Sequence, residues 1–271
     1  MTAKGVQDLI EKSGGDLPHE VADVLSKNGW VPQIGPHYID IATGKTREID
    51  IVARKAIDVR DDFYGGREKI LIRLFIECKN LESEYLLHFT PRDKEKATSI
   101  IKDNAMLRHE EHLDLTGNHY FSEKEVAKTW STKGRDDFYD AWIQSVHSMI
   151  YFSTNQNEGH YVLDLPIVVL RSFENLYKRE KTEEGYSPIK ENFQLEVDYS
   201  YPLKDRNVSK TFLVDFVSLE GLPDFLNISL KPDISLARMV LVSELSKRAF
   251  EQRQAEQRRR NSGDSPFGSS R

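Results

Sequence analysis

The segment that most constrains the fold is residues 69–79 (KILIRLFIECK), a long, mostly apolar run that ends in Glu77 and Lys79. A run of this kind is typical of a strand buried on both faces of a sheet. Residues 47–54 (REIDIVAR) form a similar run with Asp50 between two isoleucines. Burying such charges costs several kcal/mol each unless they are paired or bound to a metal. Both strands therefore need something that compensates for their charges.

The alternation of side chains along a strand places these charges together. Glu48 and Asp50 share one face of their strand, and Glu77 and Lys79 share one face of theirs, with Cys78 opposite. If the two strands are neighbours in a hairpin, one patch gathers up to three carboxylates and one ammonium. A hard divalent cation such as Mg²⁺, or Mn²⁺, prefers carboxylate and carbonyl oxygens plus water. A lysine beside such a cation can hold an attacking water or neutralise charge on a phosphoryl oxygen.

The remaining pattern predicts an α/β fold. Apolar periodicity, caps and turn residues predict helices and strands in alternation. The expected helices are 6–12, 18–28, 92–108, 136–152, 219–227 and 235–257, and the expected strands are 31–42, 47–54, 69–79, 161–170, 193–201 and 211–217. The first three of these strands should form an antiparallel meander.

The order helix, three-strand meander, helix and strand, with an acid on the second strand and acid-x-Lys on the third, resembles the PD-(D/E)xK nuclease superfamily. EIDIVA followed by IECKN looks most like its Mrr-type and related DNA-cleaving members. The resemblance covers roughly residues 18–170 and implies a restriction-endonuclease-like mixed β-sheet flanked by helices, with an α-β-β-β-α-β core. The acid-x-Lys triplet occurs once in the chain, at the end of an apolar strand.

The resemblance assigns roles residue by residue. It implies that Asp50 and Glu77 bind the metal, Mg²⁺ or Mn²⁺, together with the backbone carbonyl of Cys78. Lys79 matches the catalytic lysine. Glu20 falls where many members carry an accessory acid that contacts a metal directly or through water. A first-turn acid favoured by the helix dipole explains Glu20 equally well.

Two further residues are candidates for supporting roles. Gln144 matches a polar residue that some members aim at the site, although a polar residue on a helix flank is the commoner case. Glu48 either supports the metal or is a surface acid paired with Arg47 or Lys45. The chain departs from the family where Glu48 and Ile49 replace the usual proline before the first acid.

The function implied is metal-dependent phosphodiester hydrolysis of DNA by an endonuclease of a restriction, repair or defence type. A homodimer is expected if both strands of a duplex are cut. The main alternative is an inactive nuclease-like fold that binds nucleic acid or protein. A third interpretation is a structural sheet held by cross-strand ion pairs, in which neutralising Asp50 would destabilise the fold.

Composition narrows the class of protein. The net charge of −6 argues against a protein coated with basic surface, although it allows a local basic cleft. The single cysteine fits a reducing compartment, and neither a signal peptide nor an apolar span is evident, so a cytoplasmic protein without membrane contact is expected. We expect one nuclease-like domain over 1–260 and a disordered tail over 261–271.

Three polar stretches remain outside this core. Residues 82–133 are expected to be an irregular insertion, with His109, His112 and His119 solvated rather than bound to zinc. Residues 177–188 are expected to be an exposed charged loop. The basic run 247–260 has the mixed charge of a solvated helix end, with phosphate contact as the alternative.

Overall fold

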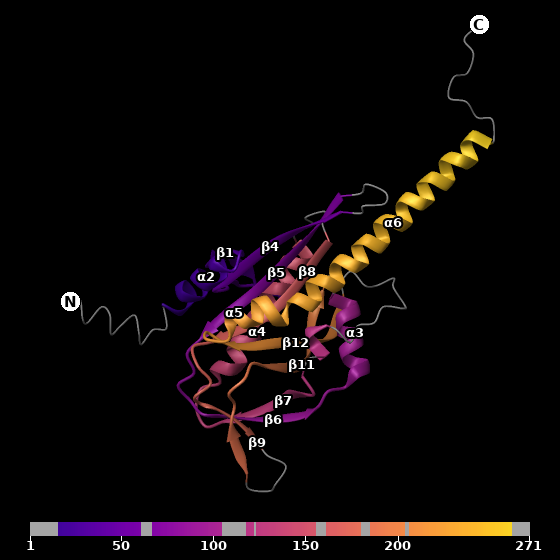
Figure 1. The fold of residues 1–271 in the computed structure, drawn as a ribbon. Helices are drawn as coiled ribbons and strands as arrows, with labels where there is room; N and C mark the ends of the chain where they lie inside the picture. Colours follow the sequence, from indigo (N-terminus) through magenta and orange to yellow (C-terminus); the bar gives the residue numbers. More distant parts are fainter. Residues whose placement is uncertain are drawn as a thin grey trace, which may run out of the picture.

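The computed structural model describes residues 16–60, 67–104, 118–121, 123–155, 161–179, 185–203 and 206–261. The chain forms an α/β structure in which a mixed sheet of ten strands has helices on both faces (Figure 1). The expected helix at 6–12 and the tail beyond residue 261 lie outside the described residues. Within the described residues, no helix is both long and apolar enough to cross a membrane.

The elements follow one another as the apolar pattern predicts, with additions. In chain order they are α2 (Leu17–Lys27), β1 (Val31–Ile34), β2 (His37–Ile39), β3 (Thr46–Glu48), β4 (Ile51–Arg60), β5 (Arg67–Lys79), β6 (Tyr85–Pro91), α3 (Lys94–Asn104), η1 (His119–Phe121), β7 (Glu125–Thr132), α4 (Asp137–Asn155), β8 (Tyr161–Leu170), β9 (Leu176–Arg179), β10 (Tyr186–Pro188), β11 (Phe193–Leu203), β12 (Arg206–Ser218), α5 (Leu222–Asp224), η2 (Phe225–Ser229) and α6 (Lys231–Asn261). The sheet order is β1-β4-β5-β8-β12-β11-β7-β6-β9-β10.

The first four strands of the sheet confirm the predicted meander. β1 and β5 both pair antiparallel with β4, and β8 then adds parallel to β5 after the crossover through α4. The expected long strand over 31–42 is broken, because Gly35 has a φ of +67° and Pro36 has no N–H to donate to a ladder. The chain after the break forms β2, which pairs with β3 in a separate hairpin.

Each face of the sheet buries its own core. α2 and α6 cover one face, where they pack on Ile76 and Val169. α4 covers the other face and packs on Phe75 and Val168. The β2–β3 hairpin packs on α4 from outside, where the Tyr38 and Tyr151 rings lie 6.4 Å apart. α4 is therefore enclosed between the sheet and the hairpin.

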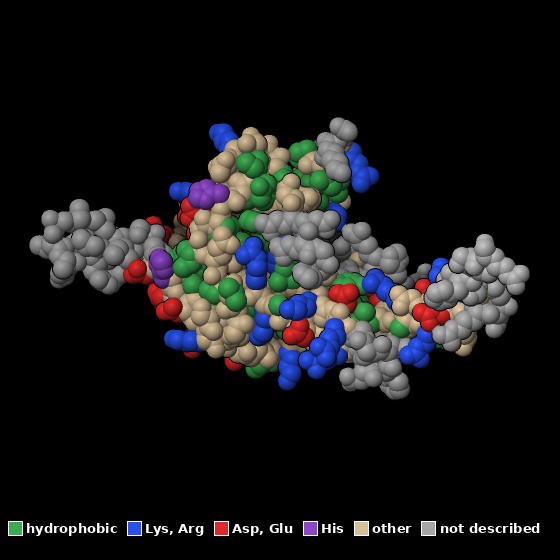
Figure 2. Space-filling model, turned by 90° about the horizontal axis from the view of Figure 1, so that it is seen from above, with side chains coloured by type: hydrophobic (Ala, Val, Ile, Leu, Met, Phe, Trp, Pro, Cys, Tyr) green, Lys and Arg blue, Asp and Glu red, His purple; other side chains and the backbone are tan. Residues whose placement is uncertain are grey.

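The end of α6 extends beyond the sheet (Figure 1). The side chains of residues 250–259 are exposed, and Figure 2 shows basic and acidic side chains side by side on this projecting part. The arrangement agrees with a solvated helix end.

The expectation of an irregular stretch between β5 and α4 is wrong at both its ends. β6 and β7 pair with each other and join the main sheet. The sequence predicted only one element in this stretch, the helix that the structure shows as α3. Tyr85 and Leu87 alternate onto the core face of β6. The opposite face of this region is charged, and Lys128 on β7 forms an ion pair with Glu196 on β11. These charged residues masked the alternation of apolar and polar side chains that indicates a strand. The expected loop at 177–188 likewise contains β9 and β10.

His119 is not solvated, contrary to expectation. Its ring is 3% exposed, with Nε2 3.1 Å from Oδ2 of Asp215 on β12 and Nδ1 2.8 Å from Oδ1 of Asp233 on α6. Burial alone lowers the pKa of the imidazole, but the two aspartates outweigh it and raise that pKa to about 10. The protonated ring therefore joins η1, β12 and α6. His109 and His112 lie outside the described residues.

A buried ion pair at the centre of the sheet provides a test of the fold. Arg73 on β5 is 1% exposed, and its Nε and Nη2 lie 2.7 and 2.8 Å from the two carboxylate oxygens of Asp164 on β8. Replacing Asp164 by Ala leaves the guanidinium buried without this partner, so we expect the free energy of unfolding in urea to fall by ~3 kcal/mol. Asp58→Ala removes an exposed pair with Lys69 and should cost less than ~1 kcal/mol. Equal losses in the two variants would contradict the assignment.

Candidate active site

The charged residues of β4 and β5 meet at one end of the sheet. Asp50 immediately precedes β4, and the pairing of Ile51 with Ile76 brings it opposite the end of β5. Oδ2 of Asp50 accepts a hydrogen bond of 2.7 Å from the Cys78 backbone N–H. Lys79 Nζ lies 2.7 Å from Oε1 of Glu77. The structure thus brings three of the sequence-predicted residues together.

Glu77 is the most buried member of this cluster. Its side chain is 4% exposed, and its Oε2 has no hydrogen-bond partner within the described part of the chain. The Lys79 side chain is 27% exposed, so the ammonium is open to solvent while it contacts Glu77. The Cys78 side chain belongs to the core on the opposite face, as its parity in the strand predicts. The thiol is therefore directed away from the carboxylates.

Burial and mutual repulsion perturb the carboxylates. Burial and the charge of Asp50 raise the pKa of Glu77 to about 8, against the opposing effect of Lys79. Burial also raises the pKa of Asp50, although the Cys78 N–H and Lys79 act in the opposite direction. Burial alone would lower the pKa of Lys79, but the attraction of Glu77 and Asp50 raises it. Lys79 is therefore protonated, and Glu77 loses its proton at a higher pH than an ordinary carboxyl group does.

Tyr38 is a site residue that the sequence did not reveal. It lies on β2, is 1% exposed, and its hydroxyl has no hydrogen-bond partner among the residues described. Its pKa is raised by burial and then by the charges of Glu77 and Asp40. Two buried oxygens without partners, Oε2 of Glu77 and the Tyr38 hydroxyl, therefore lie within electrostatic reach of each other. An isolated tyrosine in a short strand gives no sequence signal of this proximity.

Asp40 fixes the hairpin that carries Tyr38. Its buried carboxylate forms an ion pair with Arg47 across the hairpin, and its Oδ1 lies 3.2 Å from Nδ1 of His147 on α4. Nε2 of His147 is 2.7 Å from the Tyr199 hydroxyl on β11. This chain of contacts ties the hairpin to α4 and to the main sheet.

Glu20 is not brought to the carboxylates. Its Oε1 lies 2.8 Å from Nη2 of Arg171, which directly follows β8. The two side chains, with Asp16 and Asn80, line a hollow of about 390 Å³. The backbone N–H of Arg171 donates to the Lys79 carbonyl, so Glu20 lies beside the end of β5. Among the described residues, Glu20 forms no hydrogen bond or ion pair with Asp50 or Glu77.

Glu48 and Gln144 form no hydrogen bond or ion pair with Asp50, Glu77 or Lys79 among the described residues. The Glu48 side chain is 58% exposed and pairs weakly with His37 at 3.9 Å, rather than with Arg47 or Lys45. Its charge raises the pKa of Asp50, although burial has a larger effect on that pKa. Gln144 donates to the Asp140 carbonyl of its own helix. The residue of α4 that acts on Lys79 is instead Asp137, whose charge helps to raise the lysine pKa.

The cluster has the donor set of a hard-cation site. Asp50 and Glu77 provide carboxylate oxygens, and the buried Oε2 of Glu77 has no hydrogen-bond partner within the described ranges. Mg²⁺ in proteins is commonly held by one or two carboxylates, with water completing the shell. Among the described residues, no group of three or more His, Cys, Asp or Glu side chains is placed to hold a metal. The chemistry of the two carboxylates, and not their number, is what fits a hard cation.

The raised pKa of Glu77 predicts how stability depends on pH. Between pH 4.5 and about 8, folded Glu77 keeps a proton that the unfolded chain has lost. The free energy of unfolding without metal should therefore decrease as pH rises through this window, by up to ~1.4 kcal/mol per pH unit. Glu77→Gln cannot lose that proton and should flatten the slope, whereas the exposed Glu82→Gln should preserve it. Urea unfolding in EDTA at several pH values measures both slopes, and identical slopes for wild type and Glu77→Gln would refute the assignment.

Comparison with known proteins gives no independent assignment. Protein-family models, curated proteins and solved structures contain no significant match to this chain.

Proposed function

We propose that the protein is a metal-dependent endonuclease that hydrolyses phosphodiester bonds in DNA, of the PD-(D/E)xK type. The observation that carries the proposal is the buried Glu77 beside Asp50 and Lys79 at the end of two paired strands, with one oxygen that has no hydrogen-bond partner among the described residues. A carboxylate buried in this way is costly unless a cation or a proton compensates for it. Perturbed carboxylates beside a solvent-accessible lysine are characteristic of catalytic sites.

The path of the chain supports the same proposal. α2, β1, β4, β5, α4 and β8 follow the order of the restriction-endonuclease-like core, with the antiparallel meander next to a parallel strand. The acid before β4 and the acid-x-Lys triplet at the end of β5 match the positions to which the resemblance assigns catalysis, which supports the proposal. Neither feature depends on the β6–β7 segment or on the C-terminal strands.

The roles of the residues follow from their positions. Asp50 and Glu77 would hold Mg²⁺ or Mn²⁺ with the Cys78 carbonyl. The bound ion supplies positive charge to the phosphate oxygens of the substrate. Lys79 is protonated and partly open to solvent, so its ammonium would orient the attacking water or offset the charge that grows on the phosphate, rather than remove a proton.

Cleavage assays test the proposal directly. Plasmid and single-stranded DNA are incubated with wild type and with Lys79→Ala in Mg²⁺, Mn²⁺ or EDTA. We expect cleavage by wild type that requires metal, and a rate at least ~10²-fold lower in Lys79→Ala, since one charge-stabilising donor is lost. Lys69→Ala changes an exposed lysine at the other end of β5 and should cleave normally. Full activity of Lys79→Ala would exclude its catalytic role.

Metal binding can be tested separately from cleavage. A cation that binds only the folded protein raises its stability, by about 2.7 kcal/mol at a concentration of 100 Kd. Mg²⁺ or Mn²⁺ should therefore raise the Tm of wild type and of Lys79→Ala, but not that of Asp50→Asn or Glu77→Gln. An equal rise in all four proteins would place metal binding elsewhere. A rise without any cleavage would favour an inactive nuclease-like module.

A further inference from the structure

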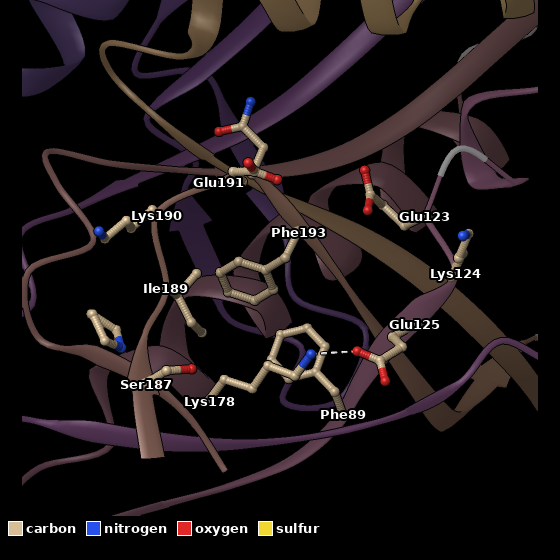
Figure 3. A pocket seen from close by; sticks show the side chains of 12 residues that line it. Phe89, Glu123, Lys124, Glu125, Lys178, Ser187, Ile189, Lys190, Glu191 and Phe193 are labelled. Carbon is tan, nitrogen blue, oxygen red and sulfur yellow. Dashed lines mark hydrogen bonds and ion pairs between the residues drawn. The ribbon is translucent and has the colours of Figure 1, made fainter. Parts of the chain in front are cut away.

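A second hollow lies near the far end of the sheet from β1. It has a volume of about 630 Å³, within the range of small-molecule sites, and is built from β6, β7, β9 and the segment that leads into β11 (Figure 3). Phe89, Phe193 and Ile189 give it an apolar floor. The two phenyl rings meet edge to face, with centroids 5.8 Å apart.

Charged groups of both signs surround this floor. Lys178 is held by an ion pair with Glu125, which the dashed line in Figure 3 marks. Its Nζ lies 5.0 Å from the centre of the Phe89 ring. Glu123, Lys190 and Glu191 are exposed at the rim. Arg92 donates to the Glu123 carbonyl, but within the described residues the charged ends of these three side chains form no hydrogen bond or ion pair. Three charged groups at the rim are thus available to a ligand that rests on the aromatic floor.

The strand register connects this hollow to the candidate active site. Glu77 pairs with Val168, Val168 with Phe216, and Phe216 with Phe193. Val168, Phe216 and Phe193 face α4. Glu77 lies on the same face, because it is two residues from Phe75, which also faces α4. Neighbouring strands lie ~4.8 Å apart, so three steps separate Glu77 from the floor of the hollow by roughly 14 Å. Because this row is buried beneath α4, a strand that reaches both places must pass around it and covers at least that distance, about four base-stacking steps of 3.4 Å.

We propose that this hollow binds an unpaired nucleobase of the strand that is cut at Lys79. The inference rests on the proposed function and adds to it that the substrate presents an unpaired base within a few nucleotides of the cut. A base can replace the Lys178 ammonium over the Phe89 ring, since aromatic rings bind bases by stacking. The carboxylates of Glu123 and Glu191 can accept hydrogen bonds from an exocyclic amino group. The Lys190 ammonium is available to the adjoining phosphate.

The balance of charges favours a base over simpler ligands. A free anion would meet carboxylates at the same rim as the lysines. An acyl chain would fill the floor but leave those charged groups desolvated, which is costly. A base attached to a phosphate satisfies the apolar floor, the acceptors and the ammonium together.

Fluorescence of single-stranded oligonucleotides tests the proposal. Each 12-nucleotide DNA carries one 2-aminopurine, scanned along the strand, and Lys79→Ala in EDTA prevents cleavage. We expect quenching at one or two positions. Phe89→Leu, which keeps the apolar volume, and Lys190→Glu should each weaken binding by about tenfold. Lys247→Glu on α6 changes an exposed lysine far from the hollow and should bind as tightly as the parent protein.

The outcomes separate this inference from the proposed function. If Lys79→Ala binds the strands without position-specific quenching, or both variants of the hollow bind as tightly as the parent, the nucleobase site is refuted even when wild type cleaves DNA. If quenching occurs and both variants weaken it, the site stands even when wild type cleaves nothing. An abasic residue at the quenched position should also weaken binding of the strand about tenfold. An unchanged affinity for that strand would refute the site as well.

Discussion

The charge of a buried carboxylate at the end of β5 is the constraint on which the site depends. Glu77 is buried because β4 and β8 flank its strand and α4 covers its face, so the same contacts that build the core desolvate the acid. Asp50 adds repulsion, and Lys79 offsets only part of it. A fold that needed only stability would gain from an apolar residue here, because a buried ion pair seldom stabilises more than well-packed hydrophobic side chains.

The surrounding structure keeps this costly arrangement in place. α4 lies between the sheet and the β2–β3 hairpin, and the buried contacts from Asp40 to His147 and from His147 to Tyr199 fix the hairpin over it. The hairpin in turn holds Tyr38, whose hydroxyl has no hydrogen-bond partner among the described residues. The charge of Glu77 helps to raise the pKa of this hydroxyl. Asp40 and His147 are buried at the centre of this network, while Arg47 and Tyr199 at its ends are partly exposed. Movement of the hairpin would therefore break buried polar contacts that water replaces poorly.

Local patterns predicted the elements that carry the site, and non-local pairing decided the rest. β4, β5, α4 and β8 were predictable because their apolar periods are strong, and strand parity correctly separated Glu77 from Cys78. β6 and β7 were missed because charges on their outer faces are neutralised by strands far along the chain. The two aspartates that bury His119 are likewise 96 and 114 residues away. The proximity of Tyr38 to Glu77 depends on a hairpin folding over a helix, which no single segment encodes.

The additional strands explain how one sheet can serve both chemistry and recognition. β5 and β8 end at the carboxylates, while β12 and β11 continue the same sheet, so that Phe193 falls in one row with Glu77. Sheet geometry fixes the distance along such a row, because the spacing of hydrogen-bonded strands scarcely varies. A binding surface placed by register is more rigid relative to the reacting groups than one placed by a loop. The segment between β5 and α4 therefore extends the sheet past β11, and by doing so it places Phe89 beside Phe193 in the hollow and at a fixed distance from Glu77.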